Sequence, residues 1–260
     1  MPEKHWFLKN CALFERLTPA ELSQLESRAK VRKYQRHNAL YLPADHADAV
    51  LLLASGRVKI GSLTADGKES ILAFIEPGEI FGELAIIDPG RREEFAETVE
   101  PSTVVMFPRA AFCDCMQQHA EISLGVTKLI GLRRQRIERR LKYLLFRSSR
   151  DRLIHLLLEL SEQYGESSPT AVLIQLKLSH QDLANIIGST RETVTVLLGD
   201  LEAERHLELG RRRIVILDIA RLAASLETEV PARWRSGVCP APGGNNSPKV
   251  ALSLPNRDTM

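Results

Sequence analysis

The pattern of apolar and polar positions divides the chain into a strand-rich part and helix-rich parts. From about residue 31 to 110, short apolar runs alternate with turn residues, and the clearest runs are Ala49–Leu53, Arg57–Ile60, Ser70–Ile75 and Thr103–Phe107. Asp66-Gly67 separates two of these runs, as in a β-hairpin. Strands at such close and even spacing predict a small antiparallel sandwich or barrel.

Helical patterns lie on both sides of this part. Residues 10–30 are expected to be helical, with Thr18 and Glu21 spaced as a capping box around Pro19. Residues 109–147 carry a longer helical pattern. Its apolar positions are spaced like a coiled-coil seam and predict a dimer interface at Ile130, Ile137, Leu141 and Leu144.

A helix-turn-helix pattern follows between Leu178 and Leu201. Ser179 is placed to cap a short helix, Gly188 to make the turn, and a second helix is expected to begin at Ser189 or Thr190. Small and apolar residues form the expected inward faces, which are Leu183, Ala184 and Ile187 on the first helix and Val194, Leu197, Leu198 and Leu201 on the second.

The outward face of the second helix carries candidate base readers, namely Arg191, Glu192 and Thr195. An arginine can donate two hydrogen bonds to guanine, and a glutamate can accept one from cytosine. Phosphate contacts are expected from the hydroxyls of Ser179, Ser189 and Thr190 and from the basic turn formed by Arg211, Arg212 and Arg213. The alternative is that Glu192 closes a capping box with Ser189 and that Arg191 is a solvated surface residue.

The distribution of charge along the chain is more informative about function than the net charge. The 260 residues include 35 Lys and Arg against 33 Asp and Glu, a formal net charge of +2. Between Gly131 and Arg152, however, nine cations stand against two anions. Local charge is what nucleic-acid binding needs. The basic segment is either the solvated outside of the long helix with a hinge near residues 147–150, or a groove that attracts a nucleotide with two phosphates.

These motifs together resemble the Crp/Fnr (catabolite activator protein) family of bacterial transcription regulators over about residues 10–222. The resemblance is carried by Phe81-Gly82-Glu83-Leu84-Ala85, the later Ala96 and the helix-turn-helix, which is similar to that of the cyanobacterial global nitrogen regulators. It implies an α+β fold with an N-terminal cyclic-nucleotide-binding-type β-roll (jelly roll), a long dimerisation helix and a C-terminal winged helix-turn-helix. We expect a sensor domain at 1–114, a dimerisation helix and hinge at 115–148, a DNA-binding domain at 149–225 and a disordered tail at 226–260.

The resemblance also implies a homodimer that binds palindromic double-stranded DNA, with RNA polymerase as a further partner and Arg191 and Glu192 as base readers. Family members often have a third reader, an arginine, where this chain has Val196. We expect a half-site containing GTG or GTA. The alternative is a cyclic-nucleotide-type regulatory module that acts on a protein partner without DNA.

The residues of the sensor domain give opposing indications about the effector that it binds. Gly82 and Glu83 match the turn that binds ribose and phosphate in cyclic-nucleotide members of the family. Counted back from Ala96, Glu94 and Phe95 occupy the phosphate-binding Arg-Ser positions, and a carboxylate repels phosphate. Arg91 and Arg92 are off register in this count. The sequence does not identify the effector, but it favours a cyclic dinucleotide, or no effector, over cyclic AMP. The candidate effector pocket is formed by Gly82, Glu83, Leu84, Arg91, Arg92, Arg133 and Arg134.

Other chemistries lack a motif in this sequence. One cysteine near the N-terminus is too few for an iron–sulfur cluster, and no histidine lies between His46 and His119 for haem. There is no P-loop, no nucleophile elbow and no metal-ligand spacing, so we expect no enzyme, no metal and no required cofactor. No apolar run is long enough to span a membrane and no secretory signal is present, which predicts a cytoplasmic protein with Cys113 and Cys115 as free thiols.

Overall fold

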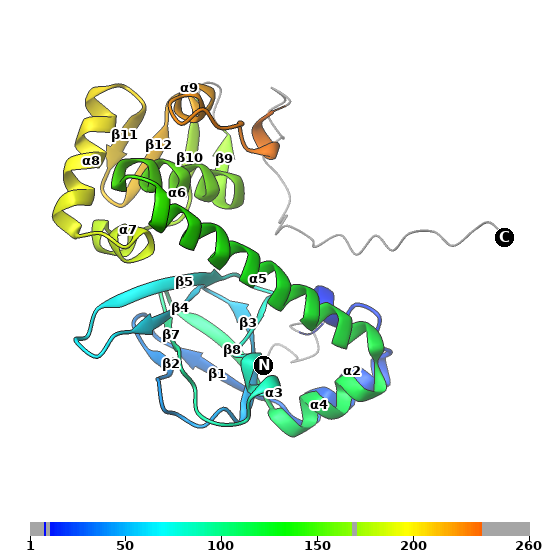
Figure 1. The fold of residues 1–260 in the computed structure, drawn as a ribbon. Coiled ribbons are helices and arrows are strands. Elements are labelled where there is room, and N and C mark those ends of the chain that lie inside the picture. The colour runs from blue at the N-terminus through cyan, green and yellow to red at the C-terminus, as the bar shows by residue number, and fades with distance from the viewer. Residues whose placement is uncertain (1–7, 9–10, 168–170, 236–260) are drawn as a thin grey trace, which may run out of the picture. The chain divides into compact units, whose positions relative to one another are not determined.

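The structure is a computed structural model that describes residue 8, residues 11–167 and residues 171–235 (Figure 1). The chain divides into two compact units, and the boundary falls between Leu132 and Arg133, inside the long helix α5 (Ala120–Phe146). The expected domain limit at residue 114 lies instead within α4 (Arg109–Gln118). The expected limit at residue 148 coincides with the break between α5 and α6 (Ser149–Tyr164).

The first unit contains two four-stranded sheets, with strand orders β1-β8-β3-β6 and β2-β7-β4-β5. Their strands are β1 (Lys30–Tyr34), β2 (Ala39–Tyr41), β3 (Ala49–Ser55), β4 (Val58–Leu63), β5 (Glu69–Ile75), β6 (Ile80–Phe81), β7 (Phe95–Thr98) and β8 (Ser102–Pro108). The four predicted apolar runs are confirmed as β3, β4, β5 and β8. Asp66-Gly67 lies between the neighbouring strands β4 and β5, and Gly67 takes the left-handed φ of +80° that such a turn requires.

Short helices accompany these sheets: η1 (Ala12–Phe14), α2 (Pro19–Arg28), α3 (Leu84–Ile87) and α4. The capping box of Thr18 and Glu21 is present, with Pro19 as the first helical residue. The continuous helix expected over residues 10–30 is wrong, because a proline at this position starts a helix but cannot continue one. His119, with extended backbone angles, separates α4 from α5.

The core of the first unit lies in two clusters. One is centred on the buried rings of Phe14, Phe107 and Phe112, whose centroids lie 5.9–6.2 Å apart. The other contains Tyr41 and Phe81, which stack with centroids 6.4 Å apart. Large aromatic side chains of this kind dominate the energetics of a core. The second cluster borders part of the expected effector pocket, which is described below.

The second unit contains the sheet β11-β12-β10-β9 and a set of helices. Its further elements are α7 (His180–Ile187), α8 (Arg191–Ala203), α9 (Ile219–Ala224), η2 (Ala232–Trp234), β9 (Gly165–Ser167), β10 (Val172–Ile174), β11 (Leu207–Gly210) and β12 (Arg213–Ile216). The apolar face of α6 is buried along its length. The predicted α+β class with a β-roll, a long helix and a winged helix-turn-helix is confirmed.

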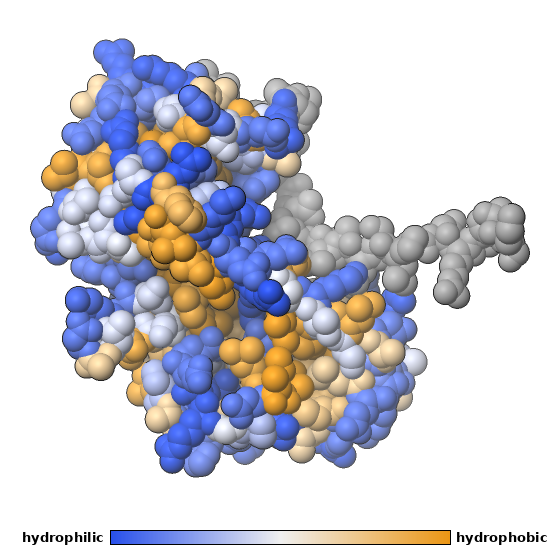
Figure 2. Space-filling view, viewed as in Figure 1, coloured by the Kyte–Doolittle hydropathy of each residue, from blue (hydrophilic) through white to orange (hydrophobic). Residues whose placement is uncertain are grey.

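An apolar strip remains exposed on the C-terminal half of α5, and Figure 2 shows it where Figure 1 places this helix. Three of the four predicted interface residues belong to it, since Ile137, Leu141 and Leu144 are 44%, 53% and 42% exposed. Ile130 differs, because it is partly buried against the core of the first unit. The strip continues through Leu145 and Phe146 at the end of the helix.

Residues 226–235 of the expected disordered tail are described by the structure and include packed positions. Leu226 is buried, and η2 contacts α6 through a hydrogen bond from Arg233 to the carbonyl oxygen of Glu162, 3.2 Å long. Trp234 supplies a large, partly buried ring in this segment. The rest of the tail, from residue 236, lies outside the described residues.

Candidate functional site

The turn between α7 and α8 is built as the sequence predicts. Ser179 caps α7 by accepting a hydrogen bond from the backbone of Asp182, whose carboxylate accepts from the Ser179 backbone at 2.8 Å. Gly188 ends the helix with a φ of +63°. A side chain at Gly188 would be strained by this φ and would also meet Leu144, so the turn needs glycine.

Thr190, not Ser189, caps α8. The Thr190 hydroxyl accepts a hydrogen bond from the Thr193 backbone at 3.2 Å, and the helix begins at Arg191. The alternative capping box between Ser189 and Glu192 is therefore wrong, because Ser189 lies one residue before the cap. Glu192 consequently stands beside Arg191 in the first turn, and both side chains are exposed.

Helix α8 has a buried face and an open face. Val194, Leu198 and Leu201 are fully buried, and Leu197 is half-buried. Thr195 and Val196 are exposed on the next turn after Arg191 and Glu192. At the far end, Asp200 and Glu202 are also exposed, and a carboxylate oxygen of Glu202 accepts from the Leu209 backbone at 2.8 Å.

One residue of this site was not identified from the sequence. His180, the first residue of α7, places its Nδ1 atom 2.8 Å from the Thr195 hydroxyl. The same hydroxyl donates to the Arg191 carbonyl oxygen at 2.8 Å. The Thr195 hydroxyl is therefore engaged within the protein. The contact depends on how α7 crosses α8, and no sequence spacing reports that crossing.

The basic turn lies between β11 and β12. Arg211 and Arg212 form the turn, and Arg213 pairs with Gly210 at the start of β12. All three arginines are exposed. Arg212 has a left-handed φ of +55°, a conformation that costs energy for any residue other than glycine. The hairpin thus presents three cations at its tip, as predicted.

In the β-roll, the sequence count misplaced Arg92. Its guanidinium is buried beside Gly82 and donates hydrogen bonds to the carbonyl oxygens of Ala49, at 2.6 Å, and Gly82, at 3.4 Å. It also lies over the ring of Tyr41, 4.0 Å from the centroid. The cause is a local pairing of residues 91–92 with residues 44–46, which sets the course of the loop.

Two carboxyl groups accompany this guanidinium. Glu83 is buried, and Glu94 accepts a hydrogen bond of 2.8 Å from the Tyr41 hydroxyl. Burial, and then the nearby Glu94, raise the pKa of Tyr41 well above its usual value. The cluster of Tyr41, Glu83, Arg92 and Glu94 therefore carries a formal charge of one negative unit.

The other expected pocket residues lie elsewhere. Arg91 is exposed and donates to the Ala44 carbonyl oxygen at 2.9 Å, and Leu84 is 48% exposed at the start of α3. Arg133 and Arg134 belong to the second unit, where Arg134 pairs with Glu138 on α5 at 2.7 Å. Of the predicted set, the structure brings together Gly82, Glu83 and Arg92.

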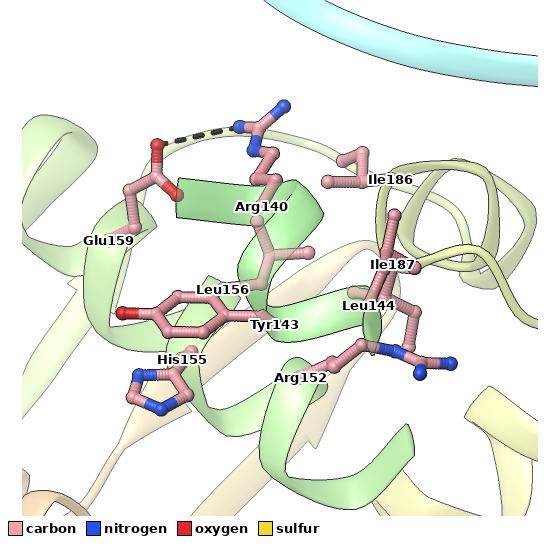
Figure 3. A pocket seen from close by; sticks show the side chains of 9 residues that line it. All are labelled: Arg140, Tyr143, Leu144, Arg152, His155, Leu156, Glu159, Ile186 and Ile187. Atoms are coloured by element: carbon pink, nitrogen blue, oxygen red, sulfur yellow. Dashed lines mark hydrogen bonds and ion pairs between the residues drawn. The ribbon is translucent and has the colours of Figure 1, made fainter. Parts of the chain in front are cut away.

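A groove lies between the end of α5 and helices α6 and α7 (Figure 3). It holds about 310 Å³ of empty space, including the part open to solvent, and is lined by Arg140, Tyr143, Leu144, Arg152, His155, Leu156, Glu159, Ile186 and Ile187. The rings of Tyr143 and His155 stack with centroids 4.2 Å apart, and Arg140 pairs with Glu159 at 3.4 Å. Burial, and then Arg147, lower the pKa of His155. These contacts hold the two helices on either side of the expected hinge.

In the part of the chain that the structure describes, the cysteines and the side chains that could bind a metal do not form a second functional site. Burial raises the pKa of Cys11 to about 12 and that of Cys115 to about 11, so neither is a thiolate at neutral pH. Among the described residues, no cluster of three or more His, Cys, Asp or Glu side chains is arranged to hold a metal ion. Within the same residues, no helix combines the length and apolar character needed to cross a membrane.

Two family descriptions match the chain. Residues 31–119 match the cyclic nucleotide-binding domain, and residues 151–225 match the Crp-like helix-turn-helix domain. The second match includes α7, α8 and the basic hairpin. It does not favour the alternative of a regulatory module that works without DNA.

The chain is similar to curated bacterial regulators over most of their length. It is 30% identical over 196 residues to the global nitrogen regulator of Synechococcus elongatus, covering 75% of this chain and 88% of that protein. It is 28% identical to the CRP-like cAMP-activated global transcriptional regulator of Mycobacterium tuberculosis, covering 83% of this chain and 96% of that protein. Both relatives are transcription regulators rather than enzymes.

Solved structures with the same fold include a CooA mutant from Carboxydothermus hydrogenoformans, with a TM-score of 0.68, 26% identity and coverage of 76% of this chain and 88% of that one. The c-di-GMP responsive regulator CLP of Xanthomonas campestris also has a TM-score of 0.68, at 23% identity, covering 77% of this chain and 99% of that one. A β-roll, a long helix and a winged helix-turn-helix thus occur together with matching sequence. The chain belongs to the Crp/Fnr family of transcription regulators, with a cyclic nucleotide-binding domain and a helix-turn-helix DNA-binding domain.

Proposed function

We propose that this chain is a homodimeric regulator that reads palindromic DNA with Arg191, Glu192 and Thr195 in the major groove. The observation that carries the proposal is the cap of α8. Because Thr190 caps the N-terminus of α8, Arg191 and Glu192 are exposed and adjacent on the first turn of the helix. The first turn of a recognition helix is the part that contacts base edges. Arginine suits guanine there, and glutamate suits cytosine.

Thr195 contributes its methyl group rather than its hydroxyl. The hydroxyl is engaged by His180 and by the Arg191 carbonyl oxygen, so the apolar part of the side chain faces outward. Phosphate contacts come from the exposed arginines of the hairpin and from Ser189, whose hydroxyl does not cap a helix. The hydroxyls of Ser179 and Thr190 serve mainly as caps, and they contact phosphate only at the cost of those bonds.

Dimerisation through α5 explains its exposed apolar strip. Ile137, Leu141 and Leu144 repeat at the spacing of a coiled-coil seam, and their exposure in a single chain leaves apolar surface to be covered. A dimer would present two α8 helices to successive major grooves about 34 Å apart. The partners are then a second copy, palindromic DNA and RNA polymerase, in the bacterial cytoplasm.

The β-roll does not bind cyclic AMP in the usual way. The Arg92 guanidinium is already held by two backbone carbonyl oxygens and the Tyr41 ring, and the Tyr41 hydroxyl lies near the carboxyl groups of Glu83 and Glu94. A phosphate entering this cluster would meet a formal negative charge at a buried site. The effector is a different molecule, of which a cyclic dinucleotide is the leading class, or the protein works without one.

The experiment that tests the DNA proposal is selection of bound duplexes from a random pool, followed by mobility shifts. We expect a palindromic site with GTG or GTA half-sites. Arg191→Ala should lose about 1–3 kcal/mol of binding at one G·C pair and no longer discriminate there. Equal binding of all sequences by the parent protein would overturn the proposal. Calorimetry with cyclic AMP and cyclic di-GMP tests the effector, and tight binding of cyclic AMP would contradict it.

A further inference from the structure

Val196 is an apolar side chain that the fold of the second unit does not use. It lies on the second turn of α8 and is 62% exposed, whereas its neighbours Val194 and Leu198 are fully buried. Among the described residues after α5, it is the one large apolar side chain that is mostly exposed. A β-branched residue at an exposed helix position also lowers helix propensity. Neither packing nor helix stability therefore accounts for it.

The surface around Val196 is small and open. Glu192 lies one turn before it, Thr195 is its neighbour, and Gly199 lies three residues after it on the same side of the helix. At Gly199, no atom of the described chain lies within 4 Å of the position that a Cβ atom would occupy. Thr195, Val196 and Gly199 therefore form an exposed surface with open space at Gly199, called the shelf below.

The placement of charges decides what meets this shelf. Asp200 and Glu202 are exposed beyond it and repel a phosphate backbone, so only the N-terminal half of α8 can lie deep in a groove. Val196 is the last exposed apolar side chain within that half. The C5-methyl of thymine is the apolar group that the major groove presents to a helix.

We propose that Val196 determines specificity by contacting the C5-methyl group of a thymine in each half-site. The inference rests on the proposed entry of α8 into the major groove and adds a fourth base reader to Arg191, Glu192 and Thr195. Four residues of helix span about 6 Å, and base pairs are about 3.4 Å apart. The thymine therefore lies within about two base pairs of the pair that Glu192 contacts. Val196 selects an A·T pair there, because an apolar side chain cannot hydrogen bond to guanine.

The test removes one methyl group from the DNA and, separately, the methyl groups from the protein. Using the full chain and its selected site, each thymine of the half-site is replaced by uracil, symmetrically in both half-sites. We expect the parent protein to lose about fourfold in affinity per half-site at one position and little at the others, as burial of one methyl group implies. Val196→Ala should bind the thymine duplex more weakly and show a smaller uracil penalty than the parent, because its single methyl group reaches less far toward the base. Val196→Thr, which keeps one methyl group, should lie between the two.

Three outcomes separate the possibilities. If the parent binds its site but no uracil substitution weakens it, Val196 is not a thymine reader although the DNA-binding proposal stands. If Val196→Ala keeps the full uracil penalty, another residue makes the contact and the inference is wrong. If no specific site is recovered for the parent, the proposed function fails together with this inference. A uracil placed outside the half-site serves as the DNA control.

Discussion

The imidazole of His180 is hydrogen-bonded to the hydroxyl of Thr195, so the first turn of α7 is joined to the second turn of the recognition helix. Thr195 in turn bonds back to Arg191, the proposed guanine reader. The three residues form one chain of contacts from α7 to the base-reading turn. We therefore predict that His180 is a positioning residue for DNA recognition.

A double-mutant cycle should detect this link. We expect His180→Ala and Thr195→Val each to weaken specific DNA binding, and the double variant to be no weaker than the more affected single variant. The coupling should be about 0.5–1.5 kcal/mol in binding and much smaller in the free energy of unfolding, because the hydrogen bond between the two side chains is exposed to solvent. Fluorescence anisotropy with the selected duplex provides the measurement. Strictly additive effects on affinity would show that the bond is incidental.

The wing arginines should act on affinity and not on sequence preference. Arg212→Gly removes a cation from a left-handed backbone position, so we expect weaker binding to every duplex and a slope of log affinity against log salt that is smaller by about 1. The same variant should unfold at a slightly higher denaturant concentration, because glycine relieves strain of about 1 kcal/mol. Arg211→Ala is the matched control, since it removes a cation without that relief. A change in base preference would argue against a phosphate contact.

Arg92 should be a structural element of the β-roll, whereas its neighbour Arg91 should not. Arg92→Leu leaves the Ala49 and Gly82 carbonyl oxygens without their buried donor, so we expect a loss of about 2–4 kcal/mol in the stability of the β-roll. Arg91→Leu changes an exposed residue next to it and should cost less than about 0.5 kcal/mol. Urea unfolding followed by circular dichroism compares the two. Similar losses in both variants would contradict the buried role of Arg92.

His155 predicts how stability depends on pH. Its pKa is lowered in the folded protein, first by burial and then by Arg147, while Asp151 acts in the opposite direction. The unfolded chain therefore binds the proton more tightly, and stability falls as the pH drops through the unfolded-state pKa of about 6.5. His155→Phe keeps a ring against Tyr143 without the proton. This variant should lose less unfolding free energy than the parent between about pH 7.5 and 5.5. Parallel losses would exclude His155 as the cause.

Much of the recognition site could be predicted because its signals are local. Ser179 with Asp182, Gly188 with its left-handed turn, and the buried positions of α8 all follow from residues a few places apart. The start of α8 was uncertain by one residue, since both Ser189 and Thr190 can cap a helix. That one residue decides whether Glu192 is used in a capping box or is available to a base.

The effector cluster could not be predicted in the same way. Counting from Ala96 assumes a loop of fixed length and course, and it placed Glu94 where a phosphate ligand was expected. The loop is instead set by pairing of Arg91 with His46, which turns the Arg92 side chain inward. Such pairing joins segments about 45 residues apart in the chain. Sequence spacing alone contains no information about it.

The charges along α8 have a consequence for the protein without DNA. At the N-terminus Arg191 opposes the helix dipole and Glu192 favours it, whereas Asp200 and Glu202 near the C-terminus both oppose it. The helix is therefore held by Val194, Leu198 and Leu201 rather than by its own charges. A polyanion laid against the first turn compensates both Arg191 and the dipole, and the surface that this turn presents exists only in the folded protein. Heparin or any DNA should thus raise the melting temperature of this domain, and the operator should add its specific increment to that general effect.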